Sequence, residues 1–116
     1  MSVEMTFETN SSGITLISLI GKLDALGAQK IDLQFSAIAK GHNKIIVNLE
    51  GVDYLASMGI RTLIMGAKVV EMKNGRIVLL NPNAEVERVL SESGVDTLIS
   101  IYHGLEKAEA AVLAWI

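Results

Sequence analysis

The chain has 116 residues and a mass of 12.5 kDa, which is the size of one domain. Half of the residues are apolar and only 4% are aromatic, so the apolar part is mainly aliphatic and intrinsic disorder is excluded. The absence of cysteine excludes disulfides and thiolate metal sites, and a net charge of −3 provides no positive excess to attract nucleic acid or an anionic membrane.

The first part of the chain predicts a β-hairpin followed by a helix. Residues 3–8 alternate apolar and polar side chains, residues 10–13 (N-S-S-G) predict a turn, and residues 14–20 predict a second strand that ends at Gly21. Asp24 is a suitable N-cap for a helix that runs to about residue 40 and stops at Gly41. Leu26 and Leu33 lie away from its main apolar face, which is formed by Ala28, Ile31, Phe35 and Ile38.

The middle of the chain predicts two strands joined by a helix. Residues 44–49 (K-I-I-V-N-L) are typical of a strand buried on both faces, and we expect residues 50–56 to form a loop. A helix is predicted over residues 57–73, a turn at Asn74-Gly75, and a strand over residues 76–80. A helix between two buried strands indicates a βαβ crossover.

The last third predicts two more helices separated by a short strand. Asn81 is placed to cap a helix with Pro82 at its first position, running to about residue 90 and closed by Ser93-Gly94. Residues 97–101 predict a short strand, and residues 104–115 a final helix with an apolar side of Leu105, Ala108, Val112 and Trp115. The order β-β-α-β-α-β-α-β-α predicts a single α/β domain over residues 1–116, with helices packed on a mixed sheet.

Motifs for catalysis, cofactors or membranes are lacking. No apolar run approaches the roughly 18 residues of a spanning helix, and the N-terminus does not resemble a secretory signal, so we expect a cytoplasmic protein. His42 and His103 both lie in polar turns, and the sequence contains no phosphate-binding glycine loop or paired-histidine metal motif. We therefore predict no catalytic residues, no metal site and no cofactor.

Ser57, at the start of the predicted helix 57–73, has two interpretations. Its hydroxyl can act as a structural N-cap for the free amides of the first turn, which would stabilise the helix by ~1 kcal/mol. A phosphate on Ser57 would meet the same amides and the positive end of the helix dipole, and would add a charge of roughly −1.5 to −2. The two interpretations are compatible.

The helix after Ser57 is apolar on two sides. Its predicted core side is formed by Ile60, Leu63, Ile64, Ala67 and Val70. Met58, Met65 and Met72 recur every seven residues on the opposite side, flanked by Arg61, Thr62, Lys68 and Val69. One alternative is that another element of the domain covers this methionine stripe; the other is that the stripe contacts a partner, for which flexible methionine side chains are well suited.

Several motifs taken together resemble the STAS domain family, and in particular the stand-alone anti-sigma factor antagonists of bacteria. They are G-K-L-D at residues 21–24, I-V-N-L at 46–49, D-Y-L-A-S-M-G-I at 53–60, N-P at 81–82 and S-G-V at 93–95. The resemblance covers nearly the whole chain. It implies a STAS-like fold, with a mixed sheet of about five strands and about four helices packed on it.

The resemblance implies a binding switch in transcription regulation rather than an enzyme. Family members bind an anti-sigma factor, often a serine kinase, and so release a sigma factor; phosphorylation of the serine that corresponds to Ser57 ends the binding, and a phosphatase restores it. Two positions depart from the family signature, because Ala56 replaces its aspartate and Met58 replaces its second Ser/Thr. The expected partner-binding residues are Asp24, Asp53, Tyr54, Ala56, Met58, Gly59, Arg61, Thr62, Met65, Lys68 and Met72.

Two other functions remain open at this stage. One is a STAS-like scaffold or subunit that is not phosphorylated, for example in a lipid-transport assembly. The other is a small enzyme or nucleotide-binding protein on the same framework. The oligomeric state is also open, because an exposed apolar face could pair with a second copy.

Overall fold

Five strands form one mixed sheet whose spatial order follows the chain. The computed structural model describes residues 2–114. β1 (Glu4–Thr9) pairs antiparallel with β2 (Thr15–Leu23), and β2, β3 (Lys44–Leu55), β4 (Arg76–Leu80) and β5 (Ile101–Tyr102) follow in parallel. The α/β class, the element order and the mixed five-stranded sheet predicted from the sequence are confirmed.

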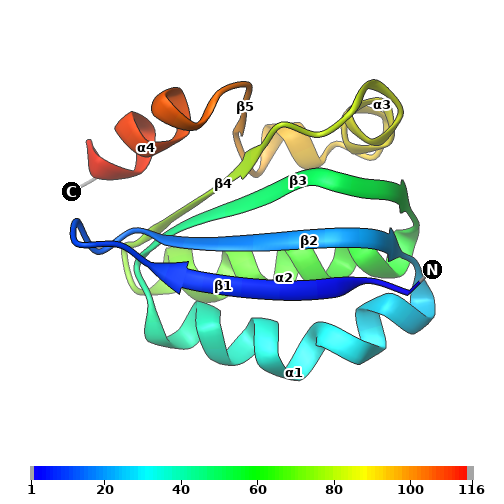
Figure 1. The fold of residues 1–116 in the computed structure, drawn as a ribbon, viewed down its shortest axis with the longest axis horizontal. Coiled ribbons are helices and arrows are strands. Elements are labelled where there is room, and N and C mark those ends of the chain that lie inside the picture. Colours follow the sequence, from blue (N-terminus) through cyan, green and yellow to red (C-terminus); the bar gives the residue numbers. More distant parts are fainter. Residues whose placement is uncertain (1, 115–116) are drawn as a thin grey trace.

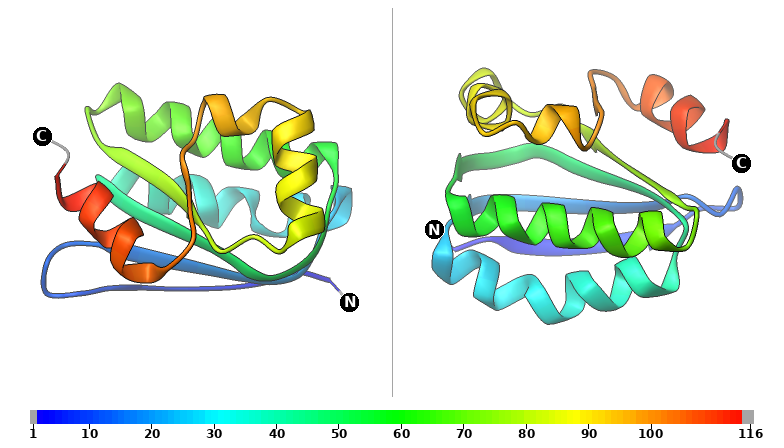
Figure 2. Two further views of the ribbon diagram at one scale, coloured as in Figure 1. Left: turned by 90° about the horizontal axis from the view of Figure 1, so that it is seen from above. Right: turned by 180° about the vertical axis from the view of Figure 1, so that it is seen from behind.

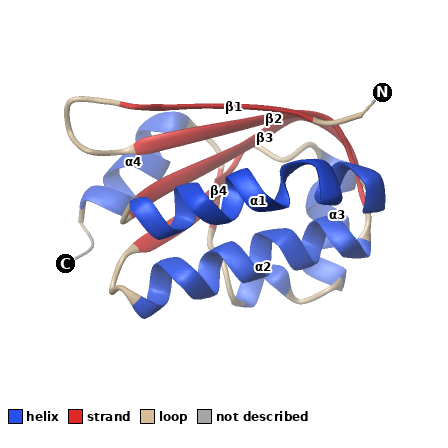
Figure 3. Ribbon diagram, turned by 90° about the horizontal axis from the view of Figure 1, so that it is seen from below, coloured by secondary structure: helices blue, strands red, loops and turns tan. Residues whose placement is uncertain are grey.

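Helices cover both faces of this sheet (Figures 1 and 2). α1 (Ala25–Gly41) and α2 (Ser57–Met72) lie side by side on one face, and they run in the same direction because each connects two parallel strands (Figure 3). α4 (Leu105–Leu113) packs on the opposite face, while α3 (Ala84–Glu92) and a short 3₁₀ turn (Val95–Thr97) follow β4.

The aliphatic residues divide between two cores. The larger core joins the inward faces of α1 and α2 to alternate residues of the strands, including Ile17, Ile45 and Val47, and extends to α3. The smaller core lies under α4 and consists of Ile14, Ile46, Val78, Leu80, Ala108 and Val112. Because β3 supplies buried residues to both cores, its continuous apolar run is explained.

The ends of α1 are held by side chains. Asp24 is the N-cap, as predicted, and its Oδ1 accepts a hydrogen bond of 2.8 Å from the Gly27 amide. At the other end Lys73, just past α2, donates through Nζ to the carbonyl oxygens of Ala39, Lys40 and His42 at 2.7 to 2.9 Å. Gly41 is the last helical residue, so the helix ends one residue later than predicted.

Two strands are longer than predicted. β2 continues past Gly21 to Leu23, and Gly21, with a φ of 106°, lies at a register shift in the β2–β3 pairing. The predicted loop over residues 50–56 is wrong, because β3 runs to Leu55 and pairs with β2 as far as Leu23. Glycine therefore marks an irregularity within the sheet, whereas the prediction took it for a strand end.

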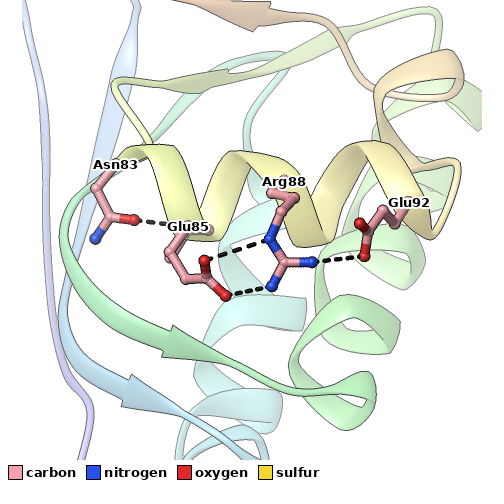
Figure 4. Close-up of polar contacts among 5 residues, drawn as sticks. Asn83, Glu85, Arg88 and Glu92 are labelled. Carbon is pink, nitrogen blue, oxygen red and sulfur yellow. Dashed lines mark hydrogen bonds and ion pairs between the residues drawn. The ribbon is translucent and has the colours of Figure 1, made fainter.

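The beginning of α3 and the segment after it also differ from the prediction. The N-cap is Asn83, whose Oδ1 accepts from the Val86 amide (Figure 4), and Pro82 precedes this cap in the sequence. Arg88 pairs with Glu85 and Glu92 along the exposed side of α3 (Figure 4). The predicted strand 97–101 is largely wrong, because Thr97 ends the 3₁₀ turn and β5 (Ile101–Tyr102) shares only Ile101 with it; predicted Trp115 lies outside the described residues.

Candidate functional site

The helices α1 and α2 begin at the edge of the sheet where β2 and β3 end (Figures 1 and 3). Ser57 is the first residue of α2 and therefore lies at this edge. Asp53 and Tyr54 are exposed near the carboxyl end of β3, and Asp24 is half-buried just before the start of α1. Because these strands are parallel, their carboxyl ends meet at one edge. The structure therefore brings Asp24, Asp53, Tyr54 and Ser57 to the same end of the molecule.

The structural role predicted for Ser57 is wrong. The N-cap of α2 is Ala56, and Ser57 is the first helical residue, with an exposed side chain. No side chain among the described residues caps α2. Since the first amides of a helix lack intrahelical acceptors, the backbone beside the Ser57 hydroxyl presents unpaired donors and the positive end of the dipole.

The start of α2 is held tightly against the end of β2. The Ala56 amide donates to the carbonyl oxygen of Leu23 at 3.1 Å, and the Ala56 carbonyl accepts from Ile60 at 3.0 Å. A Cβ on Gly59 would lie 2.5 Å from that same Leu23 oxygen, so no larger residue fits without movement. The hydrogen bond and the close approach to Leu23 together fix the position of Ser57 relative to the end of β2.

The methionine stripe is exposed. Met58, Met65 and Met72 have 41%, 51% and 85% of their surface accessible, so no described element of the domain covers them. The core side of α2 is as predicted, with Leu63, Ala67 and Val70 buried and Ile60 and Ile64 packed partly against the core. The alternative of an internal, covered stripe is therefore wrong.

A groove runs between α1 and α2 beside this stripe. It has a volume of about 430 Å³ and is lined by Asp32, Phe35, Ser36, Met58, Arg61, Thr62, Met65, Gly66 and Val69. A Cβ on Gly66 would lie 2.4 Å from the Phe35 ring, so the absence of a side chain lets the two helices approach. Thr62 donates to Asp32 Oδ1 at 2.5 Å, and this bond joins the helices beneath the groove.

The predicted partner-binding residues do not form one compact group. Met58, Arg61 and Met65 line the groove close to Ser57, whereas Lys68 and Met72 lie towards the far end of α2, about 15 Å and about 21 Å along the helix from Met58 at 1.5 Å per residue. Thr62 is only 5% exposed and Gly59 is buried, so these two predicted residues position the helices and present little surface.

Sequence reasoning did not include the α1 side of the groove. Asp32, Phe35 and Ser36 line it from α1, and Gly66 lines it from α2. The available signal was Gly66 in mid-helix, where glycine costs about 1 kcal/mol relative to alanine and therefore indicates a close packing contact. A helical wheel for one helix does not show what the neighbouring helix contributes.

Within residues 2–114, acidic and histidine side chains do not gather in a group able to hold a metal ion. The same residues contain no helix of the length and apolar character needed to cross a membrane.

The chain belongs to the STAS-domain family, whose model matches residues 8–108. Among its relatives, an anti-sigma F factor antagonist of Lysinibacillus sphaericus is 34% identical over 82 residues, covering 69% of this chain and 70% of the relative. The family resemblance predicted from the sequence is confirmed.

Solved structures support the same assignment of fold. An anti-sigma factor antagonist from Mycobacterium paratuberculosis superposes with a TM-score of 0.86 at 20% identity, over 96% of this chain and 94% of that chain. The Bacillus cell fate determinant SpoIIAA in its phosphorylated form superposes with a TM-score of 0.71 at 25% identity, over 94% and 99%. The STAS-like architecture is therefore shown.

Proposed function

We propose that this protein is a bacterial, cytoplasmic anti-sigma factor antagonist formed by a single STAS domain. It binds an anti-sigma factor of the serine-kinase type and thereby frees a sigma factor for transcription. Phosphorylation of Ser57 ends the complex and a phosphatase restores it. In this role the protein is a regulated binding partner and carries out no catalysis of its own.

The observation that supports this proposal is the setting of Ser57 within a STAS fold. Its side chain is exposed at the first position of α2, beside exposed Met58 and at the edge that also presents Asp53 and Tyr54. The relatives are named as anti-sigma factor antagonists, and SpoIIAA is known in both a phosphorylated and an unphosphorylated form. An accessible hydroxyl at the start of a helix is suited to accept a phosphate.

The local charges explain how a phosphate would switch binding. Arg61 follows Ser57 by one helical turn, a spacing at which side chains of opposite charge interact. A phosphoserine of charge roughly −1.5 to −2 would be stabilised by the free amides and by Arg61. The same charge would neutralise Arg61 and place an anion at the edge of the methionine stripe, which opposes an interface that desolvates this surface.

Phosphorylation is tested with the cognate anti-sigma kinase, ATP and intact-mass measurement. We expect the wild-type protein to gain one phosphate and Ser57→Ala to gain none. Ser93→Ala is the matched control, because Ser93 is also an exposed serine at a helix end, the C-cap of α3. If Ser57→Ala still gained the phosphate and Ser93→Ala did not, the modified residue would be Ser93.

Binding is tested by titrating the same anti-sigma factor with wild-type protein, Ser57→Ala and Ser57→Asp. We expect Ser57→Ala to bind as the wild type does and Ser57→Asp to bind more weakly. Equal affinity of all three would remove the switch from the proposal.

Ala56 favours a second candidate function, a STAS scaffold or subunit that is not phosphorylated. An alanine cap leaves no carboxylate beside Ser57 to position its hydroxyl or a metal ion for a kinase. For this candidate the intact mass stays unchanged after incubation with the kinase, although the complex still forms. Restoring the carboxylate with Ala56→Asp would then be expected to allow phosphorylation.

A further inference from the structure

A cavity lies on the other face of the sheet, between α4 and the end of the β1–β2 hairpin (Figures 1 and 2). Its volume is about 310 Å³, which is at the lower end of the range of small-molecule pockets. Glu8 of β1 pairs with Leu16 of β2, and Leu16 pairs with Ile46 of β3. Residues paired across neighbouring strands have their side chains on the same face, and Ile46 belongs to the core under α4. The register of the sheet therefore places these three side chains in one row at the cavity.

The walls of the cavity come from a helix and a turn. On α4, Leu105 and Glu109 are one helical turn apart and both line the cavity. On the hairpin, Asn10 lines it, and the Asn10 Oδ1 atom accepts hydrogen bonds of 2.9 and 3.0 Å from the amides of Ser12 and Ile14. Both walls are therefore regular, hydrogen-bonded structures.

The floor of the cavity is aliphatic. Ile14 and Ile46 are buried, Leu16 is half-buried, and Leu105 at the mouth is 43% exposed. Such a floor favours a ligand with methylene groups, because each one that it covers is removed from water. A bare ion would leave this floor exposed.

Both ionisable side chains that line the cavity are carboxylates. Glu8 is exposed and Glu109 is half-buried, and within residues 2–114 neither carboxylate has a hydrogen bond or an ion pair. β3 and α4 have one lysine each, Lys44 and Lys107, and neither lines the cavity. A half-buried charge is costly unless it is paired, so the lining favours a cationic ligand.

The two carboxylates come from opposite sides of the floor. Glu8 extends from the edge strand β1, whereas Glu109 extends from α4, which packs over β3 and β4. β1 and β3 are two strand spacings apart, which is about 10 Å. A chain of methylene groups with an ammonium group at each end matches the floor and both carboxylates.

We propose that this cavity binds an aliphatic diamine. The methylene chain lies on Leu16 and Ile46, one ammonium group pairs with Glu8, and the other pairs with Glu109. The site is at the amino ends of β2 and β3, on the face opposite α2, whereas Ser57 is at the carboxyl ends of these strands. The inference goes beyond the proposed function and does not depend on it.

The probe for the test is cadaverine, a five-carbon diamine, which is titrated into protein labelled at its isoleucine and leucine methyl groups and followed by NMR. We expect the methyl signals of the four aliphatic residues that line the cavity to shift together. Leu63, buried in the larger core on the other face, is the internal reference and should not shift. Pentanol has the chain without the charge and ammonium chloride has the charge without the chain, so neither should reproduce the shifts.

Two series of ligands separate the contributions of chain and charge. Each methylene added between ethylenediamine and cadaverine should tighten binding by up to about fourfold, because more of the floor is covered. Pentylamine, which has the same chain and a single ammonium group, should bind at least about fivefold more weakly than cadaverine.

Charge removal in the protein provides matched variants. Glu8→Gln and Glu109→Gln should each weaken the binding of cadaverine at least about fivefold. Glu106→Gln makes the same change at an exposed position of α4 that does not line the cavity, and should bind as the wild type does. None of the three carboxylates is buried, and circular dichroism verifies that each variant is folded.

Four results would overturn the inference: no shift at tens of millimolar cadaverine, the same shifts with ammonium chloride, equal binding of pentylamine and cadaverine, or unchanged binding by both Glu8→Gln and Glu109→Gln. Because the assay uses neither an anti-sigma factor nor a kinase, its outcome is separable from the proposed function.

Discussion

Replacing Gly59 with alanine places a methyl group against the carbonyl oxygen of Leu23. The new Cβ would lie 2.5 Å from that oxygen and 2.7 Å from Leu23 Cγ, whereas comfortable contact needs about 3.5 Å. The start of α2 must therefore move by about 1 Å. Overpacking of this kind costs about 1 to 3 kcal/mol, and alanine returns up to about 1 kcal/mol as the better helix former. We expect a net loss of about 1 to 2 kcal/mol in the free energy of unfolding.

Urea unfolding measures this loss. With a slope of about 1 to 2 kcal/mol per molar, the midpoint should fall by about 1 M at an unchanged slope. Gly41→Ala is the matched control, because a Cβ on Gly41, at the end of α1, would meet nothing within 4 Å and should leave the midpoint equal or higher. A Gly59→Ala midpoint as high as that of Gly41→Ala would refute the argument that this contact positions the Ser57 end of α2.

Three further outcomes follow from the contacts that join the helices and support α3. Thr62→Val removes the hydrogen bond to α1 at nearly constant volume and should cost about 1 to 2 kcal/mol in urea unfolding; an unchanged midpoint would mean that the bond contributes nothing. Lys73→Met removes three bonds to the carbonyl end of α1 and should lower the melting temperature, whereas Lys68→Met, at an exposed position, should not. The hydrogen bond and charge of Arg88 hold the pKa of the Glu85 carboxyl below its ordinary value, so this pair supports folding above that ordinary value and loses its effect as the pH falls through the lowered one. Arg88→Met should therefore lower the stability slightly near neutral pH, leave it unchanged below the lowered pKa, and so flatten the acid limb of the stability profile measured by urea unfolding at several pH values.

The element order was predictable because the strongest local signals agreed with the tertiary structure. Residues 76–80 were predicted to be a strand and form β4 with the same bounds, and the aliphatic run at 44–49 is the part of β3 that supplies both cores. The errors fall where tertiary pairing overrides a local signal. Gly21 suggested a strand end and residues 50–56 a loop, yet β2 and β3 pair past Gly21 and through residues 51–55, with register shifts along the pairing.

The caps show the same limit on a smaller scale. Ser57 and Asn81 have the side chains of N-caps, but the helices begin so that Ala56 and Asn83 hold those positions. The side chain of Asn81 accepts from the Gly104 amide, a contact between segments more than twenty residues apart. Local propensity cannot anticipate such a partner.

For the candidate site, the α2 stripe could be derived from one helical wheel, and its exposure is confirmed. The groove could not be derived, because Asp32, Phe35 and Ser36 come from a helix thirty residues earlier. Whether a side chain lies in a groove depends on the register between α1 and α2, which the close contact at Gly66 determines.

Both ends of the α1–α2 pair are anchored. At one end α2 abuts the Leu23 carbonyl through Gly59, and at the other Lys73 binds the last carbonyls of α1. The separation of the two helices is therefore fixed before anything binds, and little of the binding free energy is needed to order the backbone. Adjustment to partners of different shape is left to methionine side chains with three rotatable bonds each, so the surface combines a rigid backbone with adaptable side chains.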